Sequence, residues 1–206
     1  MLLVGGRGRQ LAMIPTMPRA VVQVLLLACL LGPRGSPGPD ASSPEATVAS
    51  PRPELEAERY SGMYLYAGTD TEKTAIEAAI DHATRGMPGR LIARGELLKR
   101  SEVRPSYLIR LDGRGNLSIE TPGFPPEVYP LDGSELPVRN KYGDELRARL
   151  RFVEGALVQD SRTGDGGGTT RFELQADGKT LLVTRISWSP KLPGTVRFRL
   201  TYVRGP

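Results

Sequence analysis

The stretch "TVRFRLTYVR", residues 195–204, alternates apolar and polar side chains with a period of two. In an extended chain this period places the apolar side chains on one side and the arginines on the other. The apolar positions are Val196, Phe198, Leu200 and Tyr202. The pattern is typical of a β-strand with one buried face and one solvated face.

Segments of the same kind recur from residue 60 onward. Turn sequences rich in Gly and Asp separate them, such as "DGRG" at 112–115 and "DG" at 177–178, and these residues favour tight hairpins. Strands are therefore predicted at 62–67, 91–99, 106–111, 116–121, 127–131, 145–153, 156–162, 169–175, 180–189 and 195–204.

One segment has a different period. Residues 70–86 carry apolar side chains three or four positions apart, which gathers them into one stripe of an α-helix. The stripe consists of Ile76, Ala79, Ile80, Ala83 and Met87. Glu72 suits the first turn of a helix, and Gly86 followed by Pro88 ends it. A helix is therefore predicted directly after the first strand.

A long sheet with a single apolar face must fold over on that face, and closure into a barrel also removes its two exposed edges. The predicted fold is mainly β: one antiparallel up-and-down barrel of about eight to ten strands. One α-helix lies between the first and second strands, and the barrel domain spans residues 60–206.

The N-terminal region has the pattern of an export signal. Residues 20–31 form an apolar run that follows Arg19 and is shorter than the roughly twenty residues that span a bilayer. Residues 1–31 are therefore predicted as a signal peptide. "LLAC", 26–29, resembles a bacterial lipobox and makes Cys29 a candidate for lipidation; the alternative is an ordinary signal core that is cleaved later. Residues 32–59, rich in Pro, Ser and Ala, are predicted as a disordered tether.

These features place the protein outside the cytoplasm. We expect a periplasmic or outer-membrane-anchored envelope protein, with Cys29 as its membrane tether, or alternatively a secreted one. The net charge of +5 falls to about +2 without the three arginines before Ala20, which is too weak to indicate nucleic-acid binding.

The composition also argues against catalysis. The only cysteine is Cys29 and the only histidine is His82, on the predicted helix, so neither a cysteine-based metal site nor a Ser-His-Asp triad is expected. The acidic residues fall mainly at turns or on solvated strand faces, where their pKa values stay ordinary. We therefore expect no enzyme, no cofactor and no metal. The glycine-rich "TGDGGGTTR", 163–171, lacks a following helix and is interpreted as a hairpin tip.

The layout resembles the calycin group, which comprises the lipocalins and the intracellular fatty-acid-binding proteins. Lipocalins open with Gly-x-Trp, and this chain has Gly62-Met63-Tyr64, with Tyr in place of Trp. They also pack a last-strand arginine across that ring, for which Arg197, Arg199 or Arg204 could serve. Fatty-acid-binding proteins place their helical lid between the first and second strands, which is where residues 70–86 fall. Their carboxylate-binding Arg-x-Tyr is absent here, since Leu200 precedes Tyr202 at that spacing.

The resemblance implies a barrel that holds a small hydrophobic or amphipathic ligand, with the helix as a lid. A barrel of this size is wide enough to enclose such a molecule. The candidate cavity residues are Tyr64, Tyr66, Ile80, Phe152, Phe172, Trp188, Phe198 and Tyr202, with Thr170 and Thr184 as polar contacts. The alternative is a non-enzymatic structural or partner-binding module with a solid core, whose arginine-rich outer face meets an acidic partner or anionic lipid.

Overall fold

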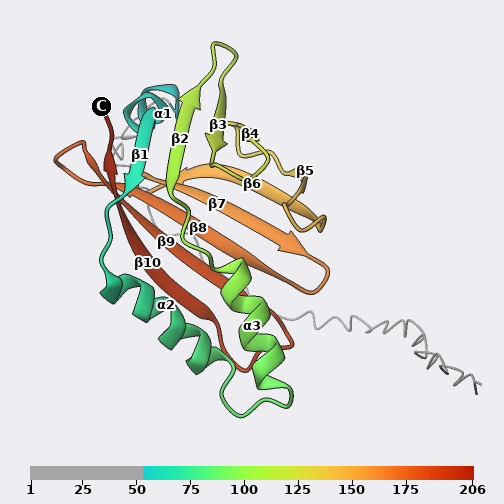
Figure 1. Ribbon diagram of the computed structural model, residues 1–206. Coiled ribbons are helices and arrows are strands. Elements are labelled where there is room, and N and C mark those ends of the chain that lie inside the picture. Colours follow the sequence, from blue (N-terminus) through green and yellow to red (C-terminus); the bar gives the residue numbers. More distant parts are fainter. Residues whose placement is uncertain (1–52) are drawn as a thin grey trace, which may run out of the picture. The chain divides into compact units, whose positions relative to one another are not determined.

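The computed structural model describes residues 53–206 (Figure 1). It contains three helices, α1 (Pro53–Tyr60), α2 (Asp70–Ala83) and α3 (Arg90–Arg100). The strands are β1 (Gly62–Tyr66), β2 (Ser106–Leu111), β3 (Asn116–Glu120), β4 (Glu127–Pro130), β5 (Leu136–Arg139), β6 (Glu145–Val153), β7 (Ala156–Thr163), β8 (Gly166–Leu174), β9 (Thr180–Trp188) and β10 (Val196–Arg204). None of the described helices is both long and apolar enough to cross a bilayer.

All ten strands belong to one antiparallel sheet. Its order is β4-β3-β2-β1-β10-β9-β8-β7-β6-β5, so strands that are neighbours in sequence pair with each other, except β4 and β5, and β1 pairs with β10. The sheet is an up-and-down barrel that is nearly closed, with β4 and β5 as its two edges. The fold class predicted from the alternating segments is confirmed.

The strands fall into a short set and a long set. Strands β1 to β5 have four to six residues, whereas β6 to β10 have eight or nine. As a result β1 pairs only with the end of β10, from Tyr66↔Tyr202 to Tyr64↔Arg204. Strands β1 to β4 thus cover one end of the long strands, whereas β5 pairs with β6 toward the opposite end.

Helix α2 continues the seam where β1 stops. Figure 1 shows it running beside β10. The Glu72 carboxylate accepts hydrogen bonds from the backbone N–H of Thr201, at 3.1 Å, and from its hydroxyl, at 2.7 Å. Ile76, Ile80 and Ala83 of the predicted apolar stripe are buried. The helix therefore protects an edge of β10 that would otherwise lack a partner.

Helix α3 corrects one sequence prediction, because residues 91–99 were expected to form a strand. The segment "LIARGELLK" contains strong helix formers and only one β-branched residue, Ile92. Ala93 and Leu97, four residues apart, share one partly buried side of the helix. Two helices therefore lie between β1 and β2, where one was predicted. Strand β5, "LPVR", was not predicted, since it offers only two alternations.

The folded domain begins earlier in the sequence than the predicted residue 60. The tether was placed at 32–59, but residues 53–59 belong to α1, in which Ala57 is buried. Ala57 and Tyr60 contribute to the same core as the barrel strands. The rest of the predicted tether, the signal peptide and Cys29 lie outside the described residues.

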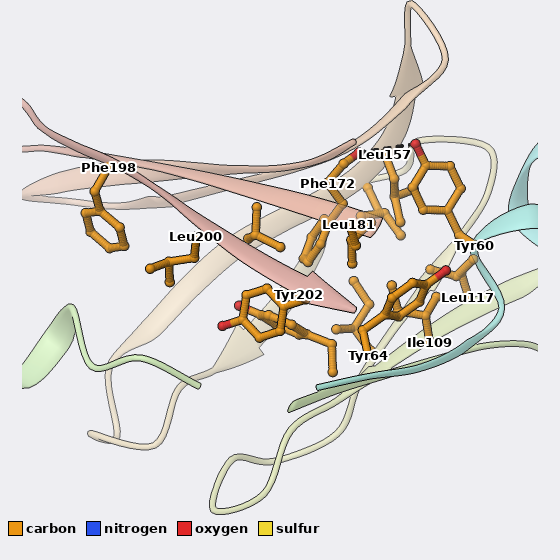
Figure 2. Packing of buried hydrophobic residues seen from close by; sticks show 14 of the residues in the cluster. Tyr60, Tyr64, Ile109, Leu117, Leu157, Phe172, Leu181, Phe198, Leu200 and Tyr202 are labelled. Atoms are coloured by element: carbon orange, nitrogen blue, oxygen red, sulfur yellow. Dashed lines mark hydrogen bonds between the residues drawn. The ribbon is translucent and has the colours of Figure 1, made fainter. Parts of the chain in front are cut away.

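The core is concentrated at the end that the short strands cover (Figure 2). Figure 2 shows aromatic rings from α1, β1, β8 and β10 converging there. The rings of Tyr107 and Phe172 meet edge to face, with centroids 5.3 Å apart, and those of Tyr107 and Tyr202 lie 4.9 Å apart. The Tyr60 hydroxyl donates to the carbonyl of Gly155 at 2.8 Å. Because these large side chains are fully buried, this end of the barrel is solid.

The first and last strands are joined by Arg204. Its guanidinium carbon lies 5.1 Å from the centre of the Tyr64 ring, and Nη2 donates to the Tyr64 hydroxyl at 2.7 Å. Nη1 and Nη2 also donate to the carbonyls of Ser61 and Arg59. The predicted packing of a last-strand arginine across the first-strand ring is confirmed, and Arg204 supplies it.

Candidate functional site

The inner faces of β7, β8 and β9 change from apolar to polar side chains about halfway along the strands. On β9, Leu181 and Val183 are buried and apolar, but the next two residues on that face are Arg185 and Ser187. The register aligns the same change on the neighbours, since Arg185 pairs with Thr170 of β8 and Thr170 pairs with Gln159 of β7. On β7 to β9 the inner face thus changes from apolar to polar at one level of the barrel, whereas the neighbouring β6 and β10 stay apolar there, at Leu150 and Phe198.

A cavity of about 1200 Å³ occupies this polar end. Part of its wall is apolar and comes from α3, the β3–β4 loop and strands β5 and β6. The apolar lining includes Ile92, Ala93, Leu97, Phe124, Val138 and Leu146. The polar lining of β7 to β9 includes Gln159, Ser161, Thr170, Arg185 and Ser187. The cavity therefore joins an apolar wall to a polar one, as an amphipathic molecule requires.

The glycines at the start of β8 leave space in this end of the barrel. Gly166, Gly167 and Gly168 all line the cavity. A Cβ atom at Gly167 would lie 2.6 Å from the carbonyl oxygen of Ser161 and 3.0 Å from the Trp188 ring, so no side chain fits there. The glycine-rich stretch is a hairpin, as predicted, and it also borders the cavity.

Most charged side chains around the cavity are neutralised locally. Five ion pairs account for them: Glu96–Lys99, Arg100–Asp144, Lys141–Glu102, Arg139–Glu145 and Lys191–Asp165. Among the charged residues that line the cavity, only three make no ion pair within residues 53–206. These three are Arg104, Arg185 and Glu127.

The two arginines are held by groups that do not neutralise them. Arg185 donates to the carbonyls of Arg100, at 3.2 Å, and Glu102, at 3.5 Å, and its guanidinium lies 5.6 Å from the Phe198 ring centre. Burial lowers the pKa of Arg185, and the nearby positive charge of Arg104 contributes to this. Arg104 lies over the Phe124 ring at 4.4 Å, and its buried Nε has no hydrogen-bond partner among the described residues. Two cations therefore face the cavity without a counter-charge.

Glu127 belongs to a hydrogen-bonded group that spans the barrel interior. Its Oε2 accepts from the Tyr129 hydroxyl, at 2.8 Å, and from the Gln159 side-chain amide. The same amide donates to the Tyr129 oxygen at 2.7 Å. Burial, followed by the charge of Glu127, raises the pKa of Tyr129. Tyr129 thus remains a neutral donor, and β4 is connected to β7 across the interior.

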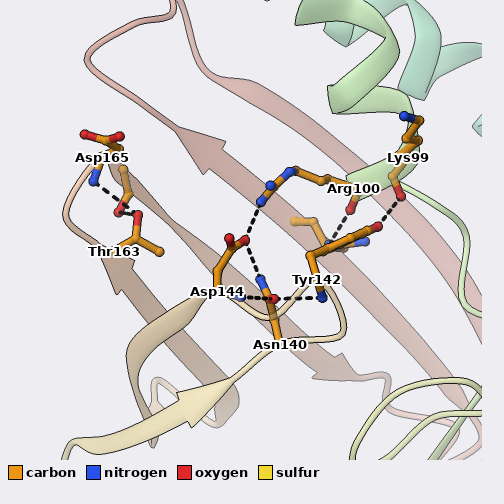
Figure 3. A network of polar contacts seen from close by, with 9 residues as sticks. Lys99, Arg100, Asn140, Tyr142, Asp144, Thr163 and Asp165 are labelled. Atoms are coloured by element: carbon orange, nitrogen blue, oxygen red, sulfur yellow. Dashed lines mark hydrogen bonds and ion pairs between the residues drawn. The ribbon is translucent and has the colours of Figure 1, made fainter. Parts of the chain in front are cut away.

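The C-terminal end of α3 is fastened to the β5–β6 hairpin (Figure 3). Asp144 pairs with Arg100 at 2.9 Å and accepts from the Asn140 amide at 3.0 Å, and the Tyr142 hydroxyl donates to the Lys99 carbonyl at 2.6 Å. At the other end of the helix Leu91 and Ile92 are exposed. We call the polar contacts among Lys99, Arg100, Asn140, Tyr142 and Asp144 the α3 latch.

The structure separates the predicted site residues from the cavity. Tyr64, Ile80, Phe172, Phe198 and Tyr202 are buried in the core, and Tyr66 and Phe152 are partly buried against it. Of the eight candidates, Trp188 alone lines the cavity, at its rim, with an exposed fraction of 44%. Thr170 also lines it, whereas Thr184 alternates with Arg185 and faces outward. The helix predicted as a lid, residues 70–86, contributes no lining residue, whereas α3 lines the cavity.

Five polar or charged residues that line the cavity were not predicted from the sequence, namely Arg104, Glu127, Tyr129, Gln159 and Arg185. A signal for two of them exists in the pattern. Gln159 lies two residues from Leu157 and Arg185 two residues from Val183, so both are polar side chains on an inner, apolar face. A polar side chain at a position where the alternation requires an apolar one indicates that the barrel interior is polar at that level.

The outer arginines of the long strands are largely paired within the sheet. Arg149 and Arg151 share the Asp160 carboxylate, at 3.3 and 3.1 Å. Arg171 pairs with Glu173, at 3.0 Å, and Arg147 with Glu135. This arrangement leaves less free positive charge on that face than the sequence alone predicts.

No family model and no curated protein matches this chain. Solved structures with a similar layout include apo lipid binding protein 8 of Caenorhabditis elegans (14% identity, 72% of this chain and 96% of that chain, TM-score 0.49). A fatty-acid-binding protein of Schistosoma mansoni with arachidonic acid gives 12% identity over 73% of this chain and 99% of that one, with a TM-score of 0.49. Fatty-acid-binding protein 1 of Echinococcus granulosus has 12% identity over 72% of this chain and 99% of that chain, with a TM-score of 0.49. These values are too low to transfer a ligand.

Proposed function

We propose that this protein is a non-enzymatic binding protein that holds an amphipathic small molecule with an acidic group. The observation that carries the proposal is the pair of cavity-lining arginines, Arg104 and Arg185, that make no ion pair among the described residues. An unpaired guanidinium inside a barrel is costly unless a ligand neutralises it. A carboxylate, sulfonate or phosphate would do so and would form charge-assisted hydrogen bonds.

The rest of the ligand would lie against the apolar wall. Leu97 of α3, Val138 of β5 and Leu146 of β6 supply apolar surface in the cavity. Burial of an alkyl or ring system there would contribute about 0.8 kcal/mol per buried CH₂. The acidic group would thus fix the orientation and the apolar part would provide much of the affinity.

A competition experiment tests the proposal. Protein stripped of lipid is loaded with the fluorescent anionic probe 1-anilinonaphthalene-8-sulfonate, which is then displaced by dodecanoate or by dodecanol, its uncharged counterpart. Dodecanoate should compete about tenfold better than dodecanol, because only the acid can pair with the arginines. The double change Arg104→Met, Arg185→Met should remove this preference.

Arg197→Met is the matched control, because Arg197 is exposed on the outer face of β10. It should leave the preference for the acid unchanged. Equal competition by acid and alcohol in the unaltered protein would contradict the assignment of an acidic ligand. Failure of both to compete, together with the absence of any bound small molecule in native mass spectrometry, would contradict a binding function.

The proposal extends to location. The apolar run at 20–31 and Cys29 within it favour an exported barrel that a lipid tethers to a membrane, with the following Pro-, Ser- and Ala-rich segment acting as a spacer. Metabolic labelling with a palmitate analogue should modify the full-length protein and not a Cys29→Ser variant. Export without labelling would favour an ordinary cleaved signal peptide.

A further inference from the structure

A second polar group of the ligand is indicated by Glu127. This carboxylate lines the same cavity as Arg104 and Arg185, and no Lys or Arg of residues 53–206 forms an ion pair with it. Tyr129 and Gln159 both donate to Oε2, whereas Oε1 accepts no hydrogen bond from the described part of the chain. A carboxylate oxygen can accept more than one hydrogen bond, so acceptor capacity remains.

The surrounding contacts hold this carboxylate in place. Gln159 contacts both Glu127 and the Tyr129 oxygen, so three side chains from β4 and β7 form a closed triangle of hydrogen bonds. Tyr129 is fully buried, and Glu127 and Gln159 are half-buried. The orientation of the carboxylate is therefore set before any ligand arrives, which lowers the entropic cost of binding.

The chemistry of this acceptor selects a hydrogen-bond donor. A carboxylate can bind a hydroxyl or an ammonium group through charge-assisted hydrogen bonds. The two unpaired arginines outnumber the one unpaired carboxylate, so an ammonium group would add positive charge to a cavity that already carries an excess of it. A hydroxyl group adds a donor without adding charge.

We propose that Glu127 is a specificity-determining residue that binds a hydroxyl group, so that the preferred ligand is a hydroxylated amphipathic acid. This inference rests on the proposed function, because it assumes that the acidic group of the ligand is bound by Arg104 and Arg185. It adds a second anchoring point, and hence a required spacing between the hydroxyl and the acid. Plain alkyl acids fill only one of the two polar positions.

The test compares dodecanoate with a series of hydroxydodecanoates that carry the hydroxyl at different carbons. At least one isomer should bind the unaltered protein about tenfold more tightly than dodecanoate, as expected for a hydrogen bond to a charged group. Glu127→Leu should abolish this gain, so that in this variant the isomer and dodecanoate bind about equally. Glu127→Gln, which keeps the shape and a neutral acceptor, should retain about threefold of the gain.

Glu120→Leu is the matched control, because Glu120 lies on the outer side of β3 and pairs with Arg110. It should keep the full preference for the hydroxylated isomer. If dodecanoate binds but no isomer binds better, or if the full gain persists in Glu127→Leu, the inference is overturned while the proposed function stands. If neither dodecanoate nor any hydroxy acid binds, the proposed function and the inference both fail.

Discussion

The two ends of the barrel are built from the same strands but serve different purposes. At one end Tyr107, Phe172 and Tyr202 meet ring to ring and fill the interior. At the other end the same faces of β7, β8 and β9 carry Gln159, Thr170 and Arg185 around an open volume. The comparison teaches that one half of β7, β8 and β9 supplies apolar packing, and that the other half carries polar side chains, including the unpaired charge of Arg185.

The largest effect should come from the solid end. Phe172→Ala removes a fully buried ring that packs edge to face on Tyr107, and we expect the free energy of unfolding to fall by about 3–5 kcal/mol. Urea denaturation measures it. The control is Ser161→Ala at the cavity end, which should cost less than about 1 kcal/mol. Equal losses of unfolding free energy in the two variants would mean that the cavity end contributes as much to stability as the solid end.

The cavity end should respond in the opposite direction. Arg104→Met removes a guanidinium whose buried Nε lacks a partner, and we expect the unliganded protein to gain about 1 kcal/mol of unfolding free energy. Thermal unfolding of lipid-free protein provides the measurement. A clear loss of stability would show that the contacts of Arg104 with Phe124 and Tyr107 outweigh its desolvation.

A smaller effect is expected at the α3 latch, where it depends on pH. Hydrogen bonds from Asn140 and Arg100 lower the pKa of Asp144, so its contribution is complete above the unfolded value of about 3.9 and is lost as the pH falls through the lower folded value. Asp144→Asn should therefore cost under about 1 kcal/mol at pH 7. Its stability difference from the unaltered protein should shrink below about pH 4. A difference that is constant from pH 7 to pH 3 would contradict this role.

The smallest effect should come from the free end of α3. Leu91 has an exposed fraction of 84%, so Leu91→Ser should change the unfolding free energy by less than about 0.5 kcal/mol. Leu97→Ser, on the partly buried side of the same helix, is the comparison and should cost more. A large loss for Leu91→Ser would mean that this end of the helix is covered in solution.

The fold could be predicted because alternation, turns and the helical stripe are local signals. They identified the long strands and α2, because each has enough residues to display its period. The segment 91–99 was misassigned because its few apolar residues fit either period, and packing against the cavity end decides the outcome. Strand β5 was missed because four residues display too little of a pattern.

The candidate site could be predicted only in part. Size and aromatic character directed the sequence interpretation to residues such as Phe172 and Tyr202, which fill the core instead. Arg104 precedes β2 and Glu127 begins the four-residue β4, so neither lies in a strand long enough to display alternation, and only the folded chain brings both to the cavity. Gln159 and Arg185 broke the alternation within predicted strands, and this break was the usable local signal.

The pairing of β1 with β10 also bears on how the chain is made. The Tyr64 hydroxyl and the Arg204 guanidinium that join across this seam are 140 positions apart in sequence. Closing so long a loop is entropically costly, and folds dominated by such contacts form slowly. During synthesis the seam cannot form until β10 has left the ribosome. At that point every other strand of the barrel is already available to pair.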